Sequence, residues 1–177
     1  MTIRKNPDTL VTFPSALGWM AMIGSGRVLK YLTFGHPSRQ AAARAVAPDL
    51  AQTAQPGDWN PDLVRRIRAY ASGSRDEFRD VQVDPGPRTD FQRRVIACCR
   101  RIPFGKTLTY GQLAARAGSS RAARAVGQCM AANRIPLVIP CHRVVAAGGG
   151  LGGYSAVGGI RTKRRLLELE ASATPRK

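Results

Sequence analysis

Apolar residues in the first part of the chain follow the pattern of a β-hairpin within residues 11–34. An apolar stretch at 18–23 is followed by Gly24-Ser25-Gly26 and then by a second apolar stretch at 28–34. Glycines between two such stretches favour a tight turn between antiparallel strands. The pattern therefore predicts two strands that meet at this turn.

A helix is predicted further along this half. Leu63, Ile67 and Tyr70 recur at the spacing that places side chains on one face of a helix. Asp62 is a suitable residue to open the helix, and Gly73 is a suitable residue to end it. We expect the helix to run between them, with the three apolar side chains facing the core.

Shorter elements complete this half. The alanine-rich segment 38–46 is expected to be helical, the proline-containing segment 55–61 to be a loop, and the segment 78–83 to be a third strand. Asp84-Pro85-Gly86-Pro87 is the strongest candidate for a linker, because prolines and glycine interrupt both helices and strands.

Two capping boxes mark helices in the second half. Thr89 and Gln92 form the first, before a helix that ends at Ile102-Pro103-Phe104-Gly105, and Thr109 and Gln112 form the second. The apolar face of the first helix consists of Phe91, Val95, Cys98, Cys99 and Ile102. On this pattern, Cys98 and Cys99 are interpreted as packing residues rather than reactive thiols.

A helix-turn-helix is predicted after the second capping box. Gly118 ends the helix that follows Thr109, and a new helix is expected from about Arg121 to Ala132. Two short helices joined by a short turn that contains glycine are typical of this motif, although many helical hairpins of this kind bind nothing.

The second helix of this pair is made mostly of small residues. Arg121, Arg124 and Gln128 are expected to share one face, and few other long side chains could reach base edges. Such a helix suits close approach to DNA with little sequence readout. The alternative is an ordinary, tightly packed alanine-rich helix whose arginines are solvated.

The charge of the chain favours a polyanionic partner. Lysine and arginine number 28 against 11 acidic residues, which gives a net charge of +17 and a pI near 11.3. The imbalance changes at the linker: residues 1–87 carry +3, whereas residues 88–177 carry +14. We therefore expect two domains, a supporting one at 1–84 and a nucleic-acid-binding one at 85–177. Solubility or attraction to a membrane surface are the alternative explanations.

Cysteine usage and hydropathy indicate an intracellular protein. The four cysteines and two histidines form neither a disulfide framework nor a zinc pattern. No stretch approaches the ~18–20 apolar residues that span a membrane, and the polar start argues against a secretory signal. A mature intracellular protein with reduced thiols is expected.

The segment 137–145 is the best candidate for chemistry. Its apolar run would continue as a strand, but Pro140 cannot donate to a strand ladder, so Cys141 is expected at a bend that directs its side chain into a cavity. The adjacent His142 suggests an activated thiolate. Because neighbouring side chains on an extended backbone point apart, a bridging water is expected to link the two residues rather than a direct bond.

A carboxylate partner for this histidine is expected from the last helix, which should begin near Thr162 after the glycine-rich loop 148–155. Glu170 lies on the apolar side of that helix, where a carboxylate needs a partner, and His142 is the candidate. The alternative is a glutamate at the helix end that reaches solvent. Glu168 is interpreted as a member of a surface ion pair.

The chain resembles the O6-alkylguanine-DNA alkyltransferases, also called methylated-DNA–protein cysteine methyltransferases. Pro140-Cys141-His142-Arg143-Val144 matches the active-site signature of that family. The supporting motifs are Ile102-Pro103-Phe104-Gly105, Thr109-Tyr110-Gly111-Gln112-Leu113-Ala114, Ala122-Ala123-Arg124-Ala125-Val126-Gly127, Asn133, Gly153-Tyr154-Ser155 and Leu166-Leu167-Glu168-Leu169-Glu170. The resemblance covers roughly residues 11–170 and is strongest from residue 89 onward.

The resemblance implies an α+β fold and a function. The fold would combine a small ribonuclease-H-like N-terminal α/β domain with a mostly helical C-terminal domain that contains the helix-turn-helix. The function would be DNA repair by direct reversal: O6-alkylguanine leaves the duplex by base flipping, and its alkyl group is transferred irreversibly to Cys141. Each molecule would act once, because the thioether product is a poor leaving group.

The resemblance also implies roles for individual residues. His142, through water, would take the thiol proton, and Glu170 would orient that histidine. Tyr110 would protonate the departing base, Arg124 would fill the gap left in the duplex, and Asn133 would tie the helix-turn-helix to the active-site segment. The other residues expected to contact DNA are Ala123, Gly127, Arg121 and Gln128, and those expected to line the substrate pocket are Met130, Pro140, Val144, Tyr154 and Ser155.

The expected partner is double-stranded DNA that contains O6-alkylguanine, with no membrane partner. The resemblance implies no cofactor. No metal is expected either, because residues 1–87 contain no cysteine and one histidine, whereas some relatives carry an N-terminal zinc site. A monomer is expected in solution, and cooperative binding to DNA is left open. The expected location is the cytoplasm at the nucleoid, or the nucleus in a eukaryote. The loop after Tyr154 is longer than in some relatives, which leaves the role of Ser155 and the pocket width open.

Three other functions are possible for a chain with these residues. A lesion sensor on the same scaffold would lack the nucleophile, and Cys141 is present. A cysteine hydrolase would have no need of a strongly basic catalytic half. A helix-turn-helix regulator is disfavoured by a helix with few base-reading side chains, although regulation triggered by methylation stays open.

Overall fold

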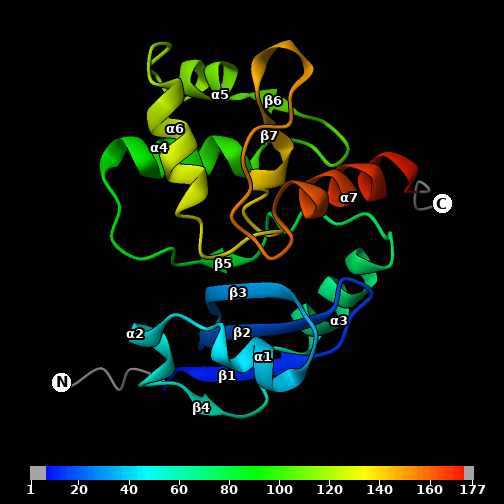
Figure 1. Cartoon of the computed structure of the whole chain (residues 1–177). Helices are drawn as coiled ribbons and strands as arrows, with labels where there is room; N and C mark the ends of the chain where they lie inside the picture. The colour runs from blue at the N-terminus through cyan, green and yellow to red at the C-terminus, as the bar shows by residue number, and fades with distance from the viewer. Residues whose placement is uncertain (1–6, 174–177) are drawn as a thin grey trace.

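The computed structural model describes residues 7–173 of the chain, which form a mixed α+β protein (Figure 1). A five-stranded sheet occupies the N-terminal half, and helices dominate the C-terminal half. None of the helices in the described range is long and apolar enough to cross a membrane.

The sheet is built on a three-stranded meander. Strands β1 (Thr9–Phe13), β2 (Trp19–Ser25) and β3 (Val28–His36) pair antiparallel in sequence order. Two-residue strands extend both sides: β4 (Gln55–Pro56) lies parallel to β1, and β5 (Gln82–Val83) lies parallel to β3. The strand order is therefore β4-β1-β2-β3-β5.

Strand β2 is apolar from Trp19 to Ile23 because both of its faces are covered. Met20 and Met22 belong to the main core, whereas Ala21 and Ile23, which alternate with them, belong to a smaller core that includes residues of α1. A continuous apolar run is expected of a strand that is buried on both faces.

The predicted hairpin is present, but its turn and its extent differ from the prediction. The strands meet at Gly26-Arg27, and Gly24 stays inside β2 because the Trp59 ring packs against it. A Cβ at Gly24 would lie 2.2 Å from that ring. The separate strand β1 and the short β4, within the expected loop 55–61, were not predicted. The third strand at 78–83 is reduced to β5, since Phe78 has a positive φ of 47°.

Helix α1 (Arg39–Arg44) confirms the helix that was expected within 38–46, and α2 (Pro48–Ala51) was not predicted. Helix α3 (Pro61–Ala71) begins one residue before the expected Asp62. Asn60 caps it, since its side-chain Oδ1 accepts a hydrogen bond from the Leu63 N–H at 3.1 Å. The predicted apolar face of α3 is buried.

The helices of the C-terminal half are α4 (Asp90–Arg100), α5 (Tyr110–Arg116), α6 (Ala123–Ala131) and α7 (Gly159–Ser172). Both predicted capping boxes are formed. The turn between α5 and α6 is longer than expected, so Arg121 precedes the helix rather than sharing a helical face with Arg124 and Gln128. Helix α7 begins three residues before the expected Thr162.

The segment that leads to Cys141 is not a strand. Leu137 has a positive φ of 70°, which breaks the extended run, and Cys141–Arg143 form a short 3-10 helix directly after Pro140. Strand β7 (Val144–Val145) then pairs in parallel with β6 (Leu108–Thr109). A second 3-10 turn, Ala147–Gly149, follows.

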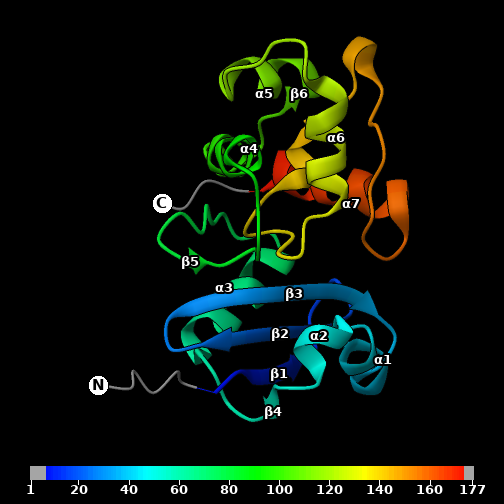
Figure 2. The ribbon, with the colours of Figure 1, turned by 90° about the vertical axis from the view of Figure 1, so that its left-hand side faces the viewer.

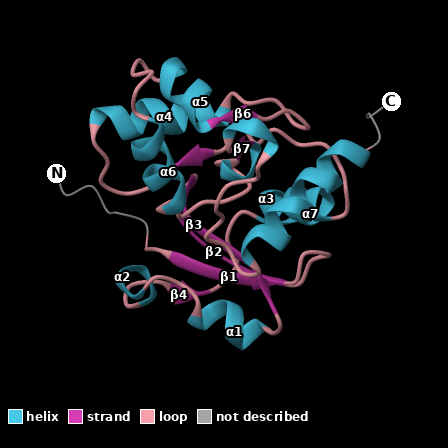
Figure 3. Cartoon of the chain, turned by 45° about the horizontal axis from the view of Figure 1, so that its top comes forward, coloured by secondary structure: helices cyan, strands magenta, loops and turns pink. Residues whose placement is uncertain are grey.

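The C-terminal half lies beyond the β3–β5 edge of the sheet, as Figures 1 and 2 both show. The Leu32 N–H of β3 donates to the Arg134 carbonyl at 2.9 Å, so the C-terminal half pairs with part of this edge. Helices α1 and α2 lie away from α4, α5 and α6 (Figure 3). One main core runs through both halves and includes Tyr70 and Phe78 as well as Val95 and Phe104.

Candidate active site

Cys141 lies at the wall of a cavity, at the start of the 3-10 turn. Cys141 is only 5% exposed to solvent. The Asn133 side-chain Nδ2 donates to the Cys141 Sγ at 3.1 Å and to the Ile139 carbonyl at 2.9 Å. The Asn133 Oδ1 accepts the Ile135 N–H at 3.0 Å, which fixes the orientation of the amide. Asn133 therefore connects the end of α6 to Cys141.

The cavity has a volume of about 410 Å³, within the range of small-ligand sites. Segments that are distant in sequence form its wall. The lining residues are Tyr110, Gly127, Met130, Ala131, Cys141, Gly153, Tyr154 and Ser155. Pro140 and Val144, which were expected in the pocket, are buried and are not part of this wall.

The β6–β7 pairing places Tyr110 and Cys141 at one cavity. It aligns Leu108 with Val144 and Thr109 with Val145, so the first residue of α5 lies beside the end of the Cys141 turn. Gly152 also approaches Tyr110 closely: a Cβ there would lie 2.7 Å from the Tyr110 hydroxyl.

His142 and Glu170 form the predicted pair in the buried interior. The His142 Nε2 lies 2.8 Å from the Glu170 Oε1, and both side chains are fully buried. Since an ionised carboxylate only accepts hydrogen bonds, Nε2 carries the hydrogen and Nδ1 carries the lone pair. That Nδ1 is buried and has no hydrogen-bond partner within residues 7–173. Burial lowers the pKa of His142, which keeps the ring neutral and able to accept a proton.

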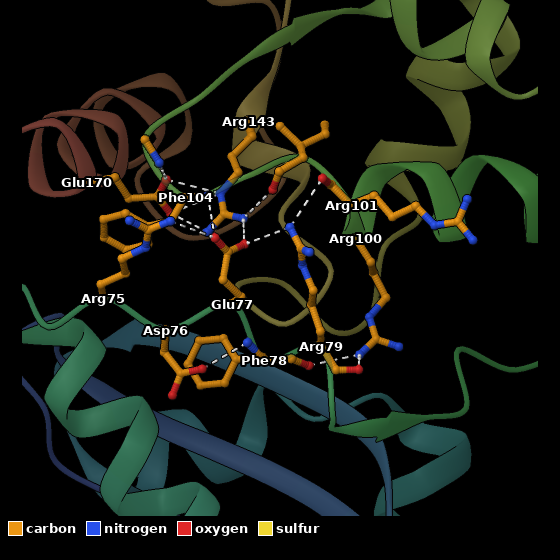
Figure 4. A network of polar contacts seen from close by, with 12 residues as sticks. Arg75, Asp76, Glu77, Phe78, Arg79, Arg100, Arg101, Phe104, Arg143 and Glu170 are labelled. Carbon is orange, nitrogen blue, oxygen red and sulfur yellow. Dashed lines mark hydrogen bonds and ion pairs between the residues drawn. The ribbon is translucent and has the colours of Figure 1, made fainter. Parts of the chain in front are cut away.

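Arg143 is the main charge partner of Glu170 (Figure 4). Its Nη2 donates to Oε1 at 2.9 Å, its Nε donates to Oε2 at 3.0 Å, and its Nη1 donates to the Ile102 carbonyl at 2.7 Å. The Gly105 N–H donates to Oε2 at 2.8 Å. Burial alone would raise the pKa of Glu170, but the hydrogen bonds from His142 and Arg143 and the positive charge of Arg143 hold it far below its usual range.

Two side chains of the N-terminal half also reach this cluster. The Tyr70 hydroxyl, from α3, donates to the Glu170 Oε1 at 2.6 Å. Glu77 lies 3.8 Å from the Arg143 guanidinium and accepts the Phe104 N–H at 3.1 Å. No role was predicted from the sequence for Tyr70 or for Arg143. Arg143 carried a signal, since a charged residue stood inside an apolar segment; Tyr70 carried only the signal of a core residue.

The thiol of Cys141 is neutral at rest. Burial raises its pKa, and the hydrogen bond from Asn133 and the positive charge of Lys163 oppose this rise. Lys163 itself is buried, with its Nζ 2.6 Å from the Val144 carbonyl, 3.1 Å from the Gly153 carbonyl and 3.5 Å from the Tyr110 hydroxyl. Burial also raises the pKa of Tyr110, so its phenol keeps its proton near neutral pH. A buried thiol of this kind needs an adjacent base to become a nucleophile.

The residues expected to contact DNA lie on or beside α6. Arg121, Arg124 and Gln128 are exposed, and Ala123 and Gly127 are half-buried. Among the residues that the structure describes, no group of three or more His, Cys, Asp or Glu side chains is arranged to hold a metal ion.

Comparison with known proteins identifies the family of this site. Residues 90–172 match the family model described as "6-O-methylguanine DNA methyltransferase, DNA binding domain". The methylated-DNA–protein-cysteine methyltransferase of Mycobacterium tuberculosis is 40% identical over 172 residues, which cover 93% of each chain. The protein of the same name from Methanosarcina acetivorans is 34% identical over 160 residues, covering 90% of this chain and 96% of that one.

Solved structures agree with this assignment. The crystal structure of the M. tuberculosis O6-methylguanine methyltransferase has a TM-score of 0.78 at 35% identity, with 96% of each chain covered. The structure of M. tuberculosis OGT in complex with DNA has a TM-score of 0.73 at 37% identity, with 94% of this chain and 95% of that one covered. The chain therefore belongs to the methylated-DNA–protein-cysteine methyltransferase family.

Proposed function

We propose that this protein repairs DNA by transferring the alkyl group of O6-alkylguanine to its own Cys141. The observation that carries the proposal is the position of Cys141 at the wall of a cavity. The next residue, His142, is a neutral base that is hydrogen-bonded to Glu170. The relatives that align with this chain along almost its whole length are named for the same reaction.

The proposed reaction is an in-line displacement. The thiol proton passes to the His142 Nδ1 through a water, and the Sγ attacks the alkyl carbon. The new C–S bond forms as the bond from carbon to the guanine O6 breaks, and the base leaves with a proton from Tyr110. This leaves His142 protonated and Tyr110 as a phenolate, and a proton passes from His142 to the Tyr110 oxygen through solvent. The net result is that guanine gains the proton that the thiol lost. The thioether does not revert, so each molecule reacts once.

The proposed roles of the other site residues follow from their contacts. Glu170 orients His142, and Asn133 fixes the position of the nucleophile through its bond to Sγ. Tyr154, Ser155 and Met130 contact the base in the cavity. Pro140 and Val144 shape the active-site segment from within the core, and the backbone of Cys141 holds the base amine.

We propose that α5, the following turn and α6 act as a helix-turn-helix on duplex DNA. The small residues Ala123 and Gly127 allow α6 to approach the minor groove, and the exposed Arg124 fills the gap that the flipped nucleotide leaves. Arg121 and Gln128 contact the backbone nearby. The charge of +14 on residues 88–177 supplies the attraction to phosphates.

The N-terminal half is proposed to be a ribonuclease-H-like domain that supports the active site, with the boundary at residues 84–85. The antiparallel meander, the helical connection through α1 and the parallel pairing of β4 with β1 support this assignment. Because the proposed substrate is genomic DNA, the protein is proposed to work in the cytoplasm of a bacterium or an archaeon, or in the nucleus of a eukaryote. We also propose that it is a monomer in solution, and cooperative binding on DNA is left to titration experiments.

Mass spectrometry of the intact protein tests the proposal. The protein is mixed with duplex DNA that carries one O6-methylguanine, and the modified peptide is mapped. We expect one added methyl group on Cys141, restored guanine in the DNA, and no addition in Cys141→Ser. Tight binding with no change in mass would instead indicate a lesion sensor and would overturn the proposal.

A further inference from the structure

We propose that Tyr70, a residue of the N-terminal half, is a positioning residue that fixes His142 in the tautomer able to accept the thiol proton. This inference rests on the proposed function, because the tautomer of His142 matters when His142 takes the proton of the Cys141 thiol. Tyr70 is not among the residues that line the cavity, and its hydroxyl is bonded to Glu170 and His142, so its effect on Cys141 passes through these two residues.

The Tyr70 hydroxyl lies beside both members of the buried pair. It lies 2.6 Å from the Glu170 Oε1 and 3.2 Å from the His142 Nε2, and all three groups are buried. The ring is held by Phe78 at a centroid distance of 5.6 Å and by Phe104 at 5.9 Å in an edge-to-face arrangement. The hydroxyl is therefore fixed by packing rather than free to rotate away.

The hydrogen bonds among Tyr70, Glu170 and His142 can each run in only one direction. Glu170 is ionised and can only accept, so the Tyr70 hydroxyl donates its one hydrogen to Oε1. The Tyr70 oxygen can then only accept from the His142 Nε2. Both neighbours of Nε2 are thus acceptors, and a ring nitrogen between two acceptors must carry the hydrogen. In a neutral imidazole this leaves the lone pair on Nδ1, the nitrogen that has no partner among the described residues.

The Nδ1–H tautomer of His142 is higher in free energy in this environment. With the hydrogen on Nδ1, the Nε2 lone pair would face both the Glu170 carboxylate and the Tyr70 oxygen inside the buried core, where repulsion between acceptors is poorly screened. Glu170 alone disfavours that arrangement, and Tyr70 adds a second acceptor and also holds Oε1 in place. The N-terminal half thereby contributes a hydrogen bond that prepares the base for Cys141.

The test compares Tyr70→Phe with wild type and with Tyr31→Phe. The matched control also removes one phenol hydroxyl from the N-terminal half, where the Tyr31 hydroxyl donates to the Ala45 carbonyl at 2.9 Å. The two readouts are the rate of methyl transfer at saturating DNA and the tautomer of His142 from its ring ¹⁵N resonances. The chain has two histidines, so assignment needs one further variant, His36→Gln.

For Tyr70→Phe we expect a roughly tenfold slower transfer, the scale of one lost hydrogen bond to a charged group, with unchanged DNA affinity. The Nδ1–H tautomer of His142 should gain population. Tyr31→Phe should change neither readout. A purely structural role for Tyr70 would lower thermal stability and leave the tautomer as in wild type. Unchanged rate and tautomer in a folded Tyr70→Phe protein would overturn the proposal.

Two further outcomes keep the inference separate from the proposed function. Should wild type transfer no methyl group, the repair function fails, and the tautomer measurement still decides the role of Tyr70. Should Tyr70→Phe fail to fold, wild type itself decides: it should show His142 as the Nε2–H tautomer and a slowly exchanging Tyr70 hydroxyl proton close to the histidine ring. A wild-type Nδ1–H tautomer would refute the inference.

Discussion

Arg143 is a buried guanidinium whose charge is neutralised by Glu170. Replacing it with methionine keeps much of the side-chain volume but leaves the carboxylate unpaired in the core. We expect Arg143→Met to lower the free energy of unfolding by about 3–5 kcal/mol, the usual cost of breaking a buried ion pair on one side. Urea titration followed by circular dichroism measures this value.

The double variant Arg143→Met/Glu170→Leu is the control for this prediction. It removes both charges, so it should lose less stability than the sum of the two single variants. Additive losses would mean that Arg143 stabilises the fold by packing alone.

Glu170 makes the free energy of unfolding depend on pH in the acidic range. Its pKa lies far below the ordinary value of 4.5 in the folded protein, so the unfolded chain takes up a proton first as the pH falls. The stabilising contribution is complete above that ordinary value and declines progressively below it. Glu170→Gln should therefore be less stable than wild type at pH 7 and should lose less stability between pH 5 and pH 3.

The matched control for this pH effect is Glu168→Gln, an exposed glutamate on the same helix. Its profile of unfolding free energy against pH should follow that of wild type. If Glu170→Gln shows the same acid loss as wild type, other carboxylates dominate the acid dependence.

Among the individual residues of the site, some could be predicted from the sequence and Tyr70 could not, for a physical reason. Cys141 and His142 are adjacent, and Glu170 follows them as a carboxylate on an apolar helix face, so a pairing could be inferred. Tyr70 lies 72 residues before His142. It occupies an apolar helix face, where a tyrosine has the same pattern as any core residue, and only the packing of α3 against α7 reveals its hydroxyl contact.

Helix α6 combines low bulk with a position beside the cavity, and Gly127 is its central residue. A Cβ there would meet the Tyr110 ring at 4.0 Å, an ordinary contact distance. Gly127→Ala should therefore raise the free energy of unfolding by about 0.5–1 kcal/mol through helix propensity. The added methyl group also narrows the cavity and the DNA-facing surface, so transfer should become slower.

Gly111→Ala, in α5, provides the comparison. Its Cβ would meet only Thr109, at 3.9 Å, and Gly111 is not part of the cavity wall. It should gain stability without a slower transfer. Equal transfer rates for both variants, measured by the same mass-spectrometric assay, would show that Gly127 has no special place in the site.

Elements were predictable where local residues determine them. The two capping boxes and the apolar spacing of α3 depend on residues within one or two turns, and all three helices are present. The two-residue strands β4 and β5 depend on partners elsewhere in the chain, which no local pattern contains. The bend before Cys141 was expected from Pro140, but the positive φ of Leu137, which removes the strand altogether, has no signal in the residue type.

The whole molecule has a main core that both halves share, despite the charge step and the linker at residues 84–87. Tyr70 and Phe78 from one half pack in the same cluster as Val95 and Phe104 from the other. We therefore expect one cooperative unfolding transition rather than two. Sequence composition suggested two domains because charge and linker residues are visible in it, whereas shared packing is not.

Two probes can check this cooperativity, because they report on different halves. Both tryptophans, Trp19 and Trp59, lie in the N-terminal half, so their fluorescence follows that half. Circular dichroism at 222 nm weights the helices, which dominate the C-terminal half. Coincident urea midpoints are expected, and midpoints that differ beyond error would show that the halves unfold independently.

The buried pair of Arg143 and Glu170 also constrains how this sequence can diverge over generations. A lineage that changes either residue alone passes through a protein with an uncompensated charge in its core, and selection removes most such intermediates. Changes at both positions together remove the uncompensated charge, but they need two mutations in one lineage and also remove the carboxylate that orients His142. The two positions should therefore be inherited as a unit, and descendants that lost one partner should have lost or replaced the other.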